Sequence, residues 1–332
     1  MAFQRAVGLT VLILLLLLCS TWSLQLAYRV LNNWLDNALP LIPLSLAAGL
    51  IISCGQIDIA SGSVFGLAGM TTLFLMSVFP VTLSFGWSLS WLATIATYGA
   101  VFGLVVYGKI PALLCTFGIS FCAQSFSVLI SKWMSDNSQS LVLPIKGPIA
   151  IFGWSWMWTL VVLAVLFWWR HRTIYGLEHI AVGIDADAAR IAGVSINSVY
   201  AFAFLSSGFL VGVSSLTFMI AYSQGGWAVN TGWGKELFAI AAAVIGGSRI
   251  TGGRFEPLTI SLATVLMAAI REVVVGALRM PAQLESLFLG IALILIALLD
   301  FSDRPQSPRL ILGWIGGRKR STGDGINNGR TG

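Results

Sequence analysis

The feature that most constrains this chain is a succession of long apolar runs, separated by short polar turns, that continues to about residue 300. The ten runs cover residues 6–18, 38–53, 60–79, 87–107, 111–131, 153–169, 198–222, 236–247, 255–276 and 284–300. One helical crossing of a bilayer takes about 20 apolar residues. The pattern therefore predicts an all-α, polytopic integral membrane protein with about ten transmembrane helices.

The charge content agrees with lipid as the solvent for most of the chain. Charged residues make up 10% of the 332 residues, against about 25% in a typical soluble domain. So few charges exclude a disordered chain and a coiled coil. The pI of 9.4 does not indicate a nucleic-acid partner, because much of the positive charge lies in the C-terminal tail.

That basic tail also sets the expected orientation, because Lys and Arg accumulate on the cytoplasmic side of a membrane. Its basic residues are Arg304, Arg309, Arg318, Lys319, Arg320 and Arg330. An even number of crossings then places both termini in the cytoplasm. We expect a transmembrane permease domain over residues 1–301. Residues 302–332 are rich in Gly, Ser and Asn, and we expect a disordered cytoplasmic tail there.

Two of the runs differ from an ordinary crossing. Run 6–18 follows Arg5 like a signal peptide, but no small-x-small cleavage site follows it, so we expect an uncleaved first helix. Run 236–247 is short, which leaves a full span, a half-helix and a re-entrant segment open. Small residues spaced as GxxxG favour close helix packing in lipid. Such pairs are Gly62/Gly66, Gly99/Gly103 and Gly208/Gly212, and packing within the chain is favoured over a dimer contact.

No pattern in the sequence indicates catalysis, a metal or a bound cofactor. The four cysteines lie in or beside apolar runs without metal-ligand spacing. Residues 103–109 match GxxxxGK, but Ile110 replaces the Ser or Thr that binds magnesium, and the match ends an apolar helix. Because no Ser–Lys, Ser–His or paired-Asp constellation lies inside the bilayer, an intramembrane enzyme is disfavoured.

Polar residues gather in three places. The first follows run 38–53 and contains Gly55, Asp58 and Gly62. Asp58 either caps the next helix or contacts a transported solute, and the cap is favoured. The third place is a turn between two apolar runs, with paired glycines on both sides. Those glycines are Gly246, Gly247, Gly252 and Gly253.

The second place is a cytoplasmic stretch in which a short helix is expected. Asp185 is a suitable N-cap and Asp187 lies in the first turn, while Gly193 ends the helix. The residues between them that favour a thin, rigid helix include Ala188, Ala189 and Arg190. Such a helix suits insertion into a groove on a partner protein, and a solvent-facing connector is the alternative.

Together the three places resemble the permease subunits of bacterial ABC importers of the ribose, xylose, galactose and galactofuranose type. Residues 55–63 read GQIDIASGS where that family has GGIDLSxGS, and residues 181–193 read AVGIDADAARIAG where it has AxGxNxxAAxxxG. Residues 246–255, GGSRITGGRF, match the third motif. The resemblance covers about residues 45–300. Departures such as Gln56 and Asp185 leave the transported solute open.

The resemblance implies a non-catalytic subunit that forms the pathway for a sugar or sugar-like solute. It implies two permease copies or related permeases, two cytoplasmic ATPase subunits that bind ATP, and a periplasmic solute-binding protein. Residues 185–193 would be the coupling helix that contacts the ATPase. Segments 132–151 and 223–235 would receive the binding protein, with Trp227 and Trp233 as aromatic anchors. The alternative is an ion-coupled secondary transporter, for which Arg271 and Glu272 are the candidate ionisable residues. Adjacent helical residues point about 100° apart, so the two need not pair, and an interfacial or subunit-contact role is favoured for them.

Overall fold

The computed structural model describes residues 37–79, 81–137, 155–221 and 227–271, together with 287, 290 and 291. The expected first span, Glu272 and the tail boundary at 301 lie outside these residues, and of the tenth span only residues 287, 290 and 291 are described. Within the described ranges the chain is helical and no strand occurs. The elements are η1 (Leu39–Leu41), α3 (Ile42–Ser53), α4 (Ser61–Val78), α5 (Leu83–Val106), α6 (Ala112–Asp136), α7 (Ser155–Arg172), α8 (Ile174–Ile184), α9 (Ala186–Ile191), α10 (Ile196–Ala221), α11 (Lys235–Ile245) and α12 (Pro257–Arg271).

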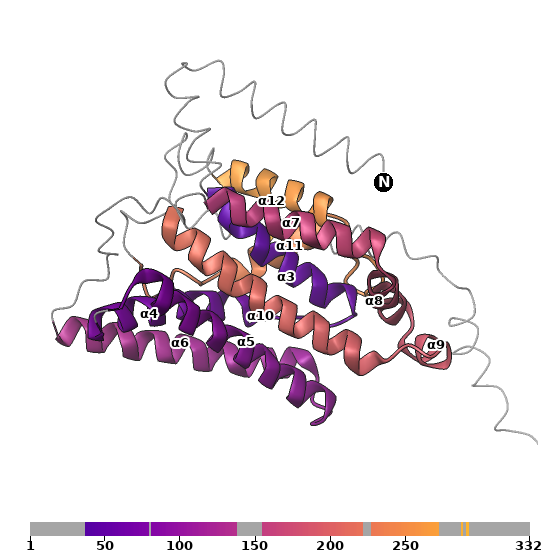
Figure 1. The fold of residues 1–332 in the computed structure, drawn as a ribbon, viewed down its shortest axis with the longest axis horizontal. Helices are drawn as coiled ribbons and strands as arrows, with labels where there is room; N and C mark the ends of the chain where they lie inside the picture. Colours follow the sequence, from indigo (N-terminus) through magenta and orange to yellow (C-terminus); the bar gives the residue numbers. More distant parts are fainter. Residues whose placement is uncertain are drawn as a thin grey trace, which may run out of the picture. The chain divides into compact units, whose positions relative to one another are not determined.

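Four of these helices are long and apolar enough to cross a membrane: α4, α5, α6 and α10. The helix α5, for example, has 24 residues, or about 36 Å at about 1.5 Å per residue. The all-α expectation is therefore confirmed for the described residues. Figure 1 shows α4, α5, α6 and α10 running side by side.

Helix α3 lies at the centre of the packed helices. All twelve of its residues are buried, because α10, α11 and α12 pack against it from different sides. A helix that is apolar all round its circumference is expected in such a place. In contrast, α5 and α6 expose large apolar side chains that include Phe85, Leu92, Leu114 and Phe121.

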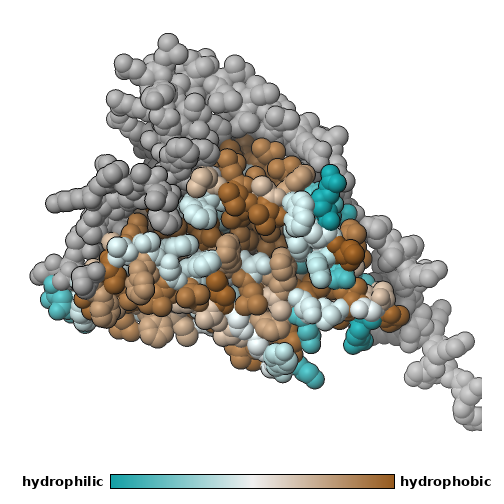
Figure 2. Space-filling view, viewed as in Figure 1, coloured by the Kyte–Doolittle hydropathy of each residue, from teal (hydrophilic) through white to brown (hydrophobic). Residues whose placement is uncertain are grey.

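The exposed apolar side chains form a broad surface. Figure 2 shows hydrophobic residues over much of the coloured surface, crossed by a pale band of intermediate residues, with hydrophilic residues gathered mainly towards its left and right ends. In water a patch of this size would favour association, whereas hydrocarbon chains solvate it. The surface thus agrees with lipid contact along α5 and α6.

Small and hydroxyl residues join the helices inside the packed region. Ser207 Oγ donates to the Ala47 carbonyl oxygen at 3.0 Å and thereby ties α10 to α3. Thr94 Oγ1 donates to the Gly208 carbonyl oxygen at 3.0 Å and ties α5 to α10. A Cβ added at Gly212 would overlap the Trp91 ring. This GxxxG pair therefore packs within the chain, as expected, while Gly103 has no atom within 4 Å of such a Cβ.

The run at 236–247 forms the 11-residue helix α11. This helix is about 16 Å long, roughly half of a hydrocarbon core of about 30 Å. Residues 227–234 before it are not helical. Trp227 lies against Gly69, and Gly232 lies against both Gly66 and Gly62. The chain thus runs along α4, from Gly69 towards Gly62, before α11 begins. Helix α11 is therefore a half-helix rather than a full span.

Candidate functional site

The short helix α9 has the local structure that its sequence predicts. Asp185 is the N-cap, and its Oδ1 accepts from the backbone N–H groups of Asp187 and Ala188 at 3.0 Å each. Arg190 donates to Asp187 Oδ1 at 2.9 Å. Gly193 follows the helix with a φ of 89°, a conformation that favours glycine. Both predicted ends of this helix are confirmed.

The two faces of α9 have different environments. Ala189 is buried and packs with Val182 and Val199 of the flanking helices. Ile191 is 87% exposed, and Ala188 is exposed as well. Ala189 therefore faces its own chain, and contact with a partner falls to the exposed residues of the helix. The sequence pattern of four alanines gave no means of telling the two faces apart.

Helix α8 precedes α9 and was not predicted from the sequence, which placed a single short helix, at residues 185–193, in this stretch. Thr173 caps it by accepting from the Gly176 N–H at 3.2 Å. The helix ends at Ile184, one residue before the N-cap of α9. Helices α8 and α9 are thus consecutive, and α8 leads from the end of α7 to α9 (Figure 1).

The three sequence motifs meet at the C-terminus of α8, in what we call the glycine joint: Ser53, Gly55, Gly183, Gly252 and Gly253. Gly253 N–H donates to the Ser53 carbonyl oxygen at 2.8 Å. A Cβ added at Gly183 would overlap that carbonyl oxygen and would lie 2.5 Å from Gly253 N. A Cβ added at Gly252 would lie 2.5 Å from the Gly183 carbonyl oxygen and 2.8 Å from Gly55 N. Three backbone segments therefore touch without side chains between them.

Backbone conformation provides a second reason for glycine at the joint. Gly55, Gly252 and Gly253 have φ values of 76°, 91° and 81°. L-residues with a Cβ rarely adopt this region. Any substitution at these three positions would strain the backbone even where space is available.

His179 closes the joint from inside α8 and is 1% exposed. Its Nε2 lies 2.8 Å from Ser53 Oγ and 3.1 Å from the Leu50 carbonyl oxygen. Because a carbonyl oxygen only accepts, we infer that Nε2 carries the proton. Burial lowers the pKa of His179 to about 4, with a smaller contribution from the Arg170 charge. The imidazole is therefore neutral at pH 7 and links α8 to the last turn of α3.

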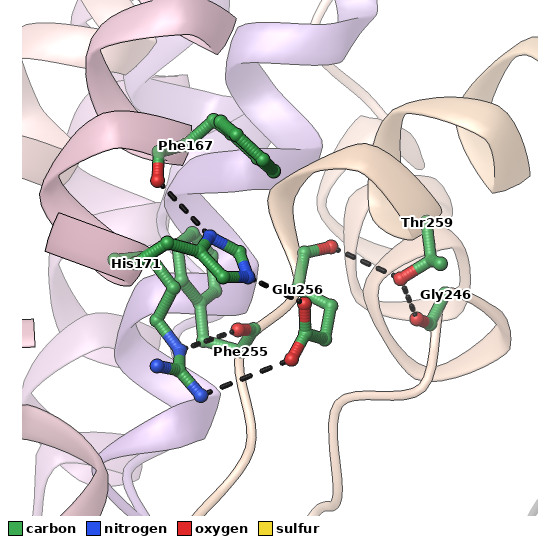
Figure 3. A network of polar contacts seen from close by, with 7 residues as sticks. Phe167, His171, Gly246, Phe255, Glu256 and Thr259 are labelled. Atoms are coloured by element: carbon green, nitrogen blue, oxygen red, sulfur yellow. Dashed lines mark hydrogen bonds and ion pairs between the residues drawn. The ribbon is translucent and has the colours of Figure 1, made fainter. Parts of the chain in front are cut away.

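The turn that carries the third motif is also held from the other side. Arg170 Nε, in the last turn of α7, donates to the Phe255 carbonyl oxygen at 3.0 Å. Glu256 forms an ion pair with Arg170 at 3.8 Å, and its other carboxylate oxygen lies 3.5 Å from His171 Nε2. Figure 3 shows His171 pointing at Glu256, and Thr259 reaching the Gly246 carbonyl oxygen. The basic end of α7 thus fixes the start of α12.

The remaining glycines of this turn serve its packing. A Cβ added at Gly246 would lie 2.5 Å from Ile260 Cα, so α11 and α12 approach closely there. Gly247 has a φ of 97°. These two glycines lie in the same turn as Gly252 and Gly253 but not in the joint itself.

Asp58 is 1% exposed and lies just before α4. Its Oδ1 accepts from the Ala60 N–H at 2.7 Å, and its Oδ2 accepts from the Tyr98 hydroxyl of α5 at 2.5 Å. The carboxylate therefore serves the N-terminal end of α4, where negative charge is favourable. The N-cap of α4 is Ala60 and it has no side-chain cap hydrogen bond, so Asp58 is not the cap that was expected. With both oxygens bonded inside the chain, Asp58 instead joins the turn before α4 to Tyr98 of α5.

Gly62 lies apart from the joint, where α4 meets the start of α11. A Cβ there would overlap the Glu236 carboxylate and would lie 2.6 Å from the Gly232 carbonyl oxygen. Nearby, Trp227 is buried between Phe65 and Phe218, and its indole N–H donates to the Gly66 carbonyl oxygen at 3.1 Å. Trp227 is therefore a packing residue, which corrects its expected role as a surface anchor. Trp233 is 67% exposed.

Long apolar helices, a half-helix and a capped surface helix agree with a membrane permease. The model of the family described as branched-chain amino acid transport system / permease component matches residues 30–297. The chain belongs to this family. It is the permease subunit of an ATP-binding-cassette importer and a multi-pass protein of the bacterial inner membrane, as its sequence motifs predicted.

Similar proteins carry a more specific description. The autoinducer 2 import system permease protein LsrC of Yersinia enterocolitica is 31% identical over 279 residues, covering 81% of this chain and 74% of the relative. LsrC of Yersinia pestis is 30% identical over 280 residues, with 81% and 76% covered. LsrC of an Enterobacter species is 31% identical over 284 residues, with 83% and 80% covered. No solved structure matches the chain.

Proposed function

We propose that this chain forms the membrane pathway for a sugar or sugar-like solute that a periplasmic binding protein delivers. The family description names branched-chain amino acids, whereas the relatives are named for autoinducer 2. The relatives match along most of their length, so autoinducer 2 is the first candidate solute to test.

The observation that carries the proposal is the exposed face of α9. The helix is capped at Asp185, it is anchored through buried Ala189, and it presents Ile191 at 87% exposure. A large apolar side chain with so little cover on a capped, rigid helix suits a groove on a protein partner. We assign this partner as the cytoplasmic ATPase subunit, which makes α9 the coupling helix.

The chemistry of ATP then lies on the partner rather than on this chain. Two ATPase subunits would bind ATP, and two permease copies or two related permeases would enclose the pathway. In this arrangement both termini are cytoplasmic and about ten helices cross the membrane. This chain needs no cofactor, because its contribution is to move when α9 is moved.

The non-helical segment 227–234 supports a pathway beside α4. Irregular backbone at membrane depth is tolerated where it is buried in protein or lines a water-filled cavity. Broken helices mark solute sites in other transporters. Trp233 is exposed at 67% next to the start of α11, and its ring offers a flat apolar face. We propose that Trp233 faces the pathway, while Trp227 and Gly232 hold the segment against α4.

Co-purification from the native host tests the assembly. The permease is extracted in mild detergent, and mass spectrometry identifies the bound subunits. We expect an ATPase in stoichiometric amount. The binding protein encoded beside the permease is then screened by thermal shift against autoinducer 2, ribose, xylose and galactose. Uptake that persists after deletion of the ATPase would contradict the proposal and favour an ion-coupled transporter.

A further inference from the structure

The glycine joint offers a mechanical link between the coupling helix and the rest of the permease. Gly183 is the second residue before Asp185, the N-cap of α9. Its Cα lies so close to the Ser53 carbonyl oxygen and Gly253 N that a methyl group has no room. A displacement of α9 therefore reaches the end of α3 and the 246–256 turn without passing through flexible side chains.

Two further contacts prevent the joint from sliding. Ser53 Oγ and His179 Nε2 lie 2.8 Å apart, so α8 is bonded to α3 one turn before the glycines. Gln56 Nε2 donates to the Tyr200 hydroxyl of α10 at 3.3 Å, so the chain after α3 is also tied to the helix that follows α9. Close-packed contacts of this kind transmit displacement rather than absorb it.

We infer that Gly183, with Ser53 and His179, positions the coupling helix so that α9, the end of α3 and the turn at 252–253 move as one unit. This inference rests on the proposed function, because it assumes that an ATPase moves α9. It adds the route by which the movement enters the membrane-embedded helices. The residues act by position, and none of them contacts ATP or solute.

Hydrogen–deuterium exchange on the purified permease–ATPase complex tests the route without knowledge of the solute. Exchange is compared between the nucleotide-free complex and the complex trapped with ATP and vanadate. In the unmodified protein we expect a trapping-dependent change in peptides covering 186–193, 51–56 and 249–254. In Gly183→Ala we expect the trapping-dependent change at 186–193 to persist. The change in the peptides covering 51–56 and 249–254 should fall about fivefold, a factor that corresponds to a typical coupling free energy.

Matched variants separate coupling from folding. Gly103→Ala makes the same change where no atom lies within 4 Å, and it should behave as the unmodified protein. If Gly183→Ala does not assemble, Ser53→Ala removes only the hydroxyl that faces His179. Its control is Ser45→Ala, because Ser45 Oγ bonds locally, to the carbonyl oxygen of Leu41 four residues earlier. A purely structural role would alter exchange equally in both nucleotide states.

The outcomes distinguish this inference from the proposed function. No trapping-dependent change at 186–193 in the unmodified complex would refute the coupling role of α9 itself. A change at 186–193 that does not extend to 51–56 and 249–254 would leave that role standing and overturn the glycine joint as its route. An undiminished change across the joint in assembled Gly183→Ala, or in Ser53→Ala when that variant is used, would also overturn it.

Discussion

Ile191 on α9 allows the ATPase contact to be tested by one substitution whose effect follows from the structure. The side chain is 87% exposed, so Ile191→Ser removes little packing from the permease itself. Complete burial of an Ile side chain stabilises an interface by about 1.5–3 kcal/mol. Loss of that burial should weaken ATPase binding by about 1–2 kcal/mol, which is about 5–30-fold in affinity.

The measurement is the affinity of the purified ATPase subunit for the permease in nanodiscs, determined by biolayer interferometry. Ile191→Leu is the matched control, because it keeps the apolar volume, and it should retain most of the affinity. The thermal midpoint of the isolated permease should be the same for both variants. Equal ATPase affinity in Ile191→Ser and the unmodified chain would refute the assignment of this face of α9 to the ATPase.

The other predictions concern the packing that supports this helix and the pathway. Trp227→Ala should lower the free energy of unfolding by about 3–5 kcal/mol, as large-to-small core changes do, whereas Trp233→Ala should change it by about 0.5 kcal/mol or less. Unfolding of the two variants in detergent provides the comparison. Equal losses of stability would contradict the buried position of Trp227. The unfolded pKa of His179 is about 6.5 and its folded pKa is lowered to about 4, so the imidazole binds its proton more readily in the unfolded chain. The stability that this group contributes should therefore be present at pH 7 and fall as the pH drops from 6.5 towards 4. Over that window the thermal midpoint of His179→Gln should depend less on pH than the thermal midpoint of the unmodified chain. Parallel profiles for the two proteins would refute this. Gly66→Ala, with Gly232 atoms 3.2 Å from the added Cβ, should lower the thermal midpoint more than Gly103→Ala does.

The apolar runs predicted most of the helices because hydrophobicity alone decides which segments enter lipid. They did not predict α8, since its eleven residues are too few to form an apolar run of spanning length, and two glycines interrupt them. Nor did they separate buried Ala189 from exposed Ala188, because neighbouring alanines are chemically identical and only the packing of α8 and α10 against α9 tells them apart. Trp227 was misplaced for a similar reason. The glycines around it in the sequence suggested a mobile surface, but its ring packs against Gly69, which lies on helix α4 far away in the sequence.

The convergence of the three motifs lay beyond sequence reasoning for a different reason. Each motif was visible in the sequence, and the expected N-cap and C-terminal glycine of α9 are confirmed. Their contact depends on close backbone approaches between segments 53–55, 183 and 252–253, which are separated by up to about 200 residues in the sequence. Periodicity carries no information about such contacts. The signal that remained was the occurrence of glycine in all three motifs.

The burial of α3 on every side has a consequence for how the protein is made. The helix is twelve residues long, about 18 Å, which is shorter than a hydrocarbon core of about 30 Å. The helices that enclose it, α10, α11 and α12, are synthesised more than 140 residues later. A ribosome at about 5–20 residues per second therefore leaves α3 without its final neighbours for many seconds. Biogenesis must shelter this segment until the C-terminal half arrives, so fragments that end before α10 should be degraded rather than accumulate.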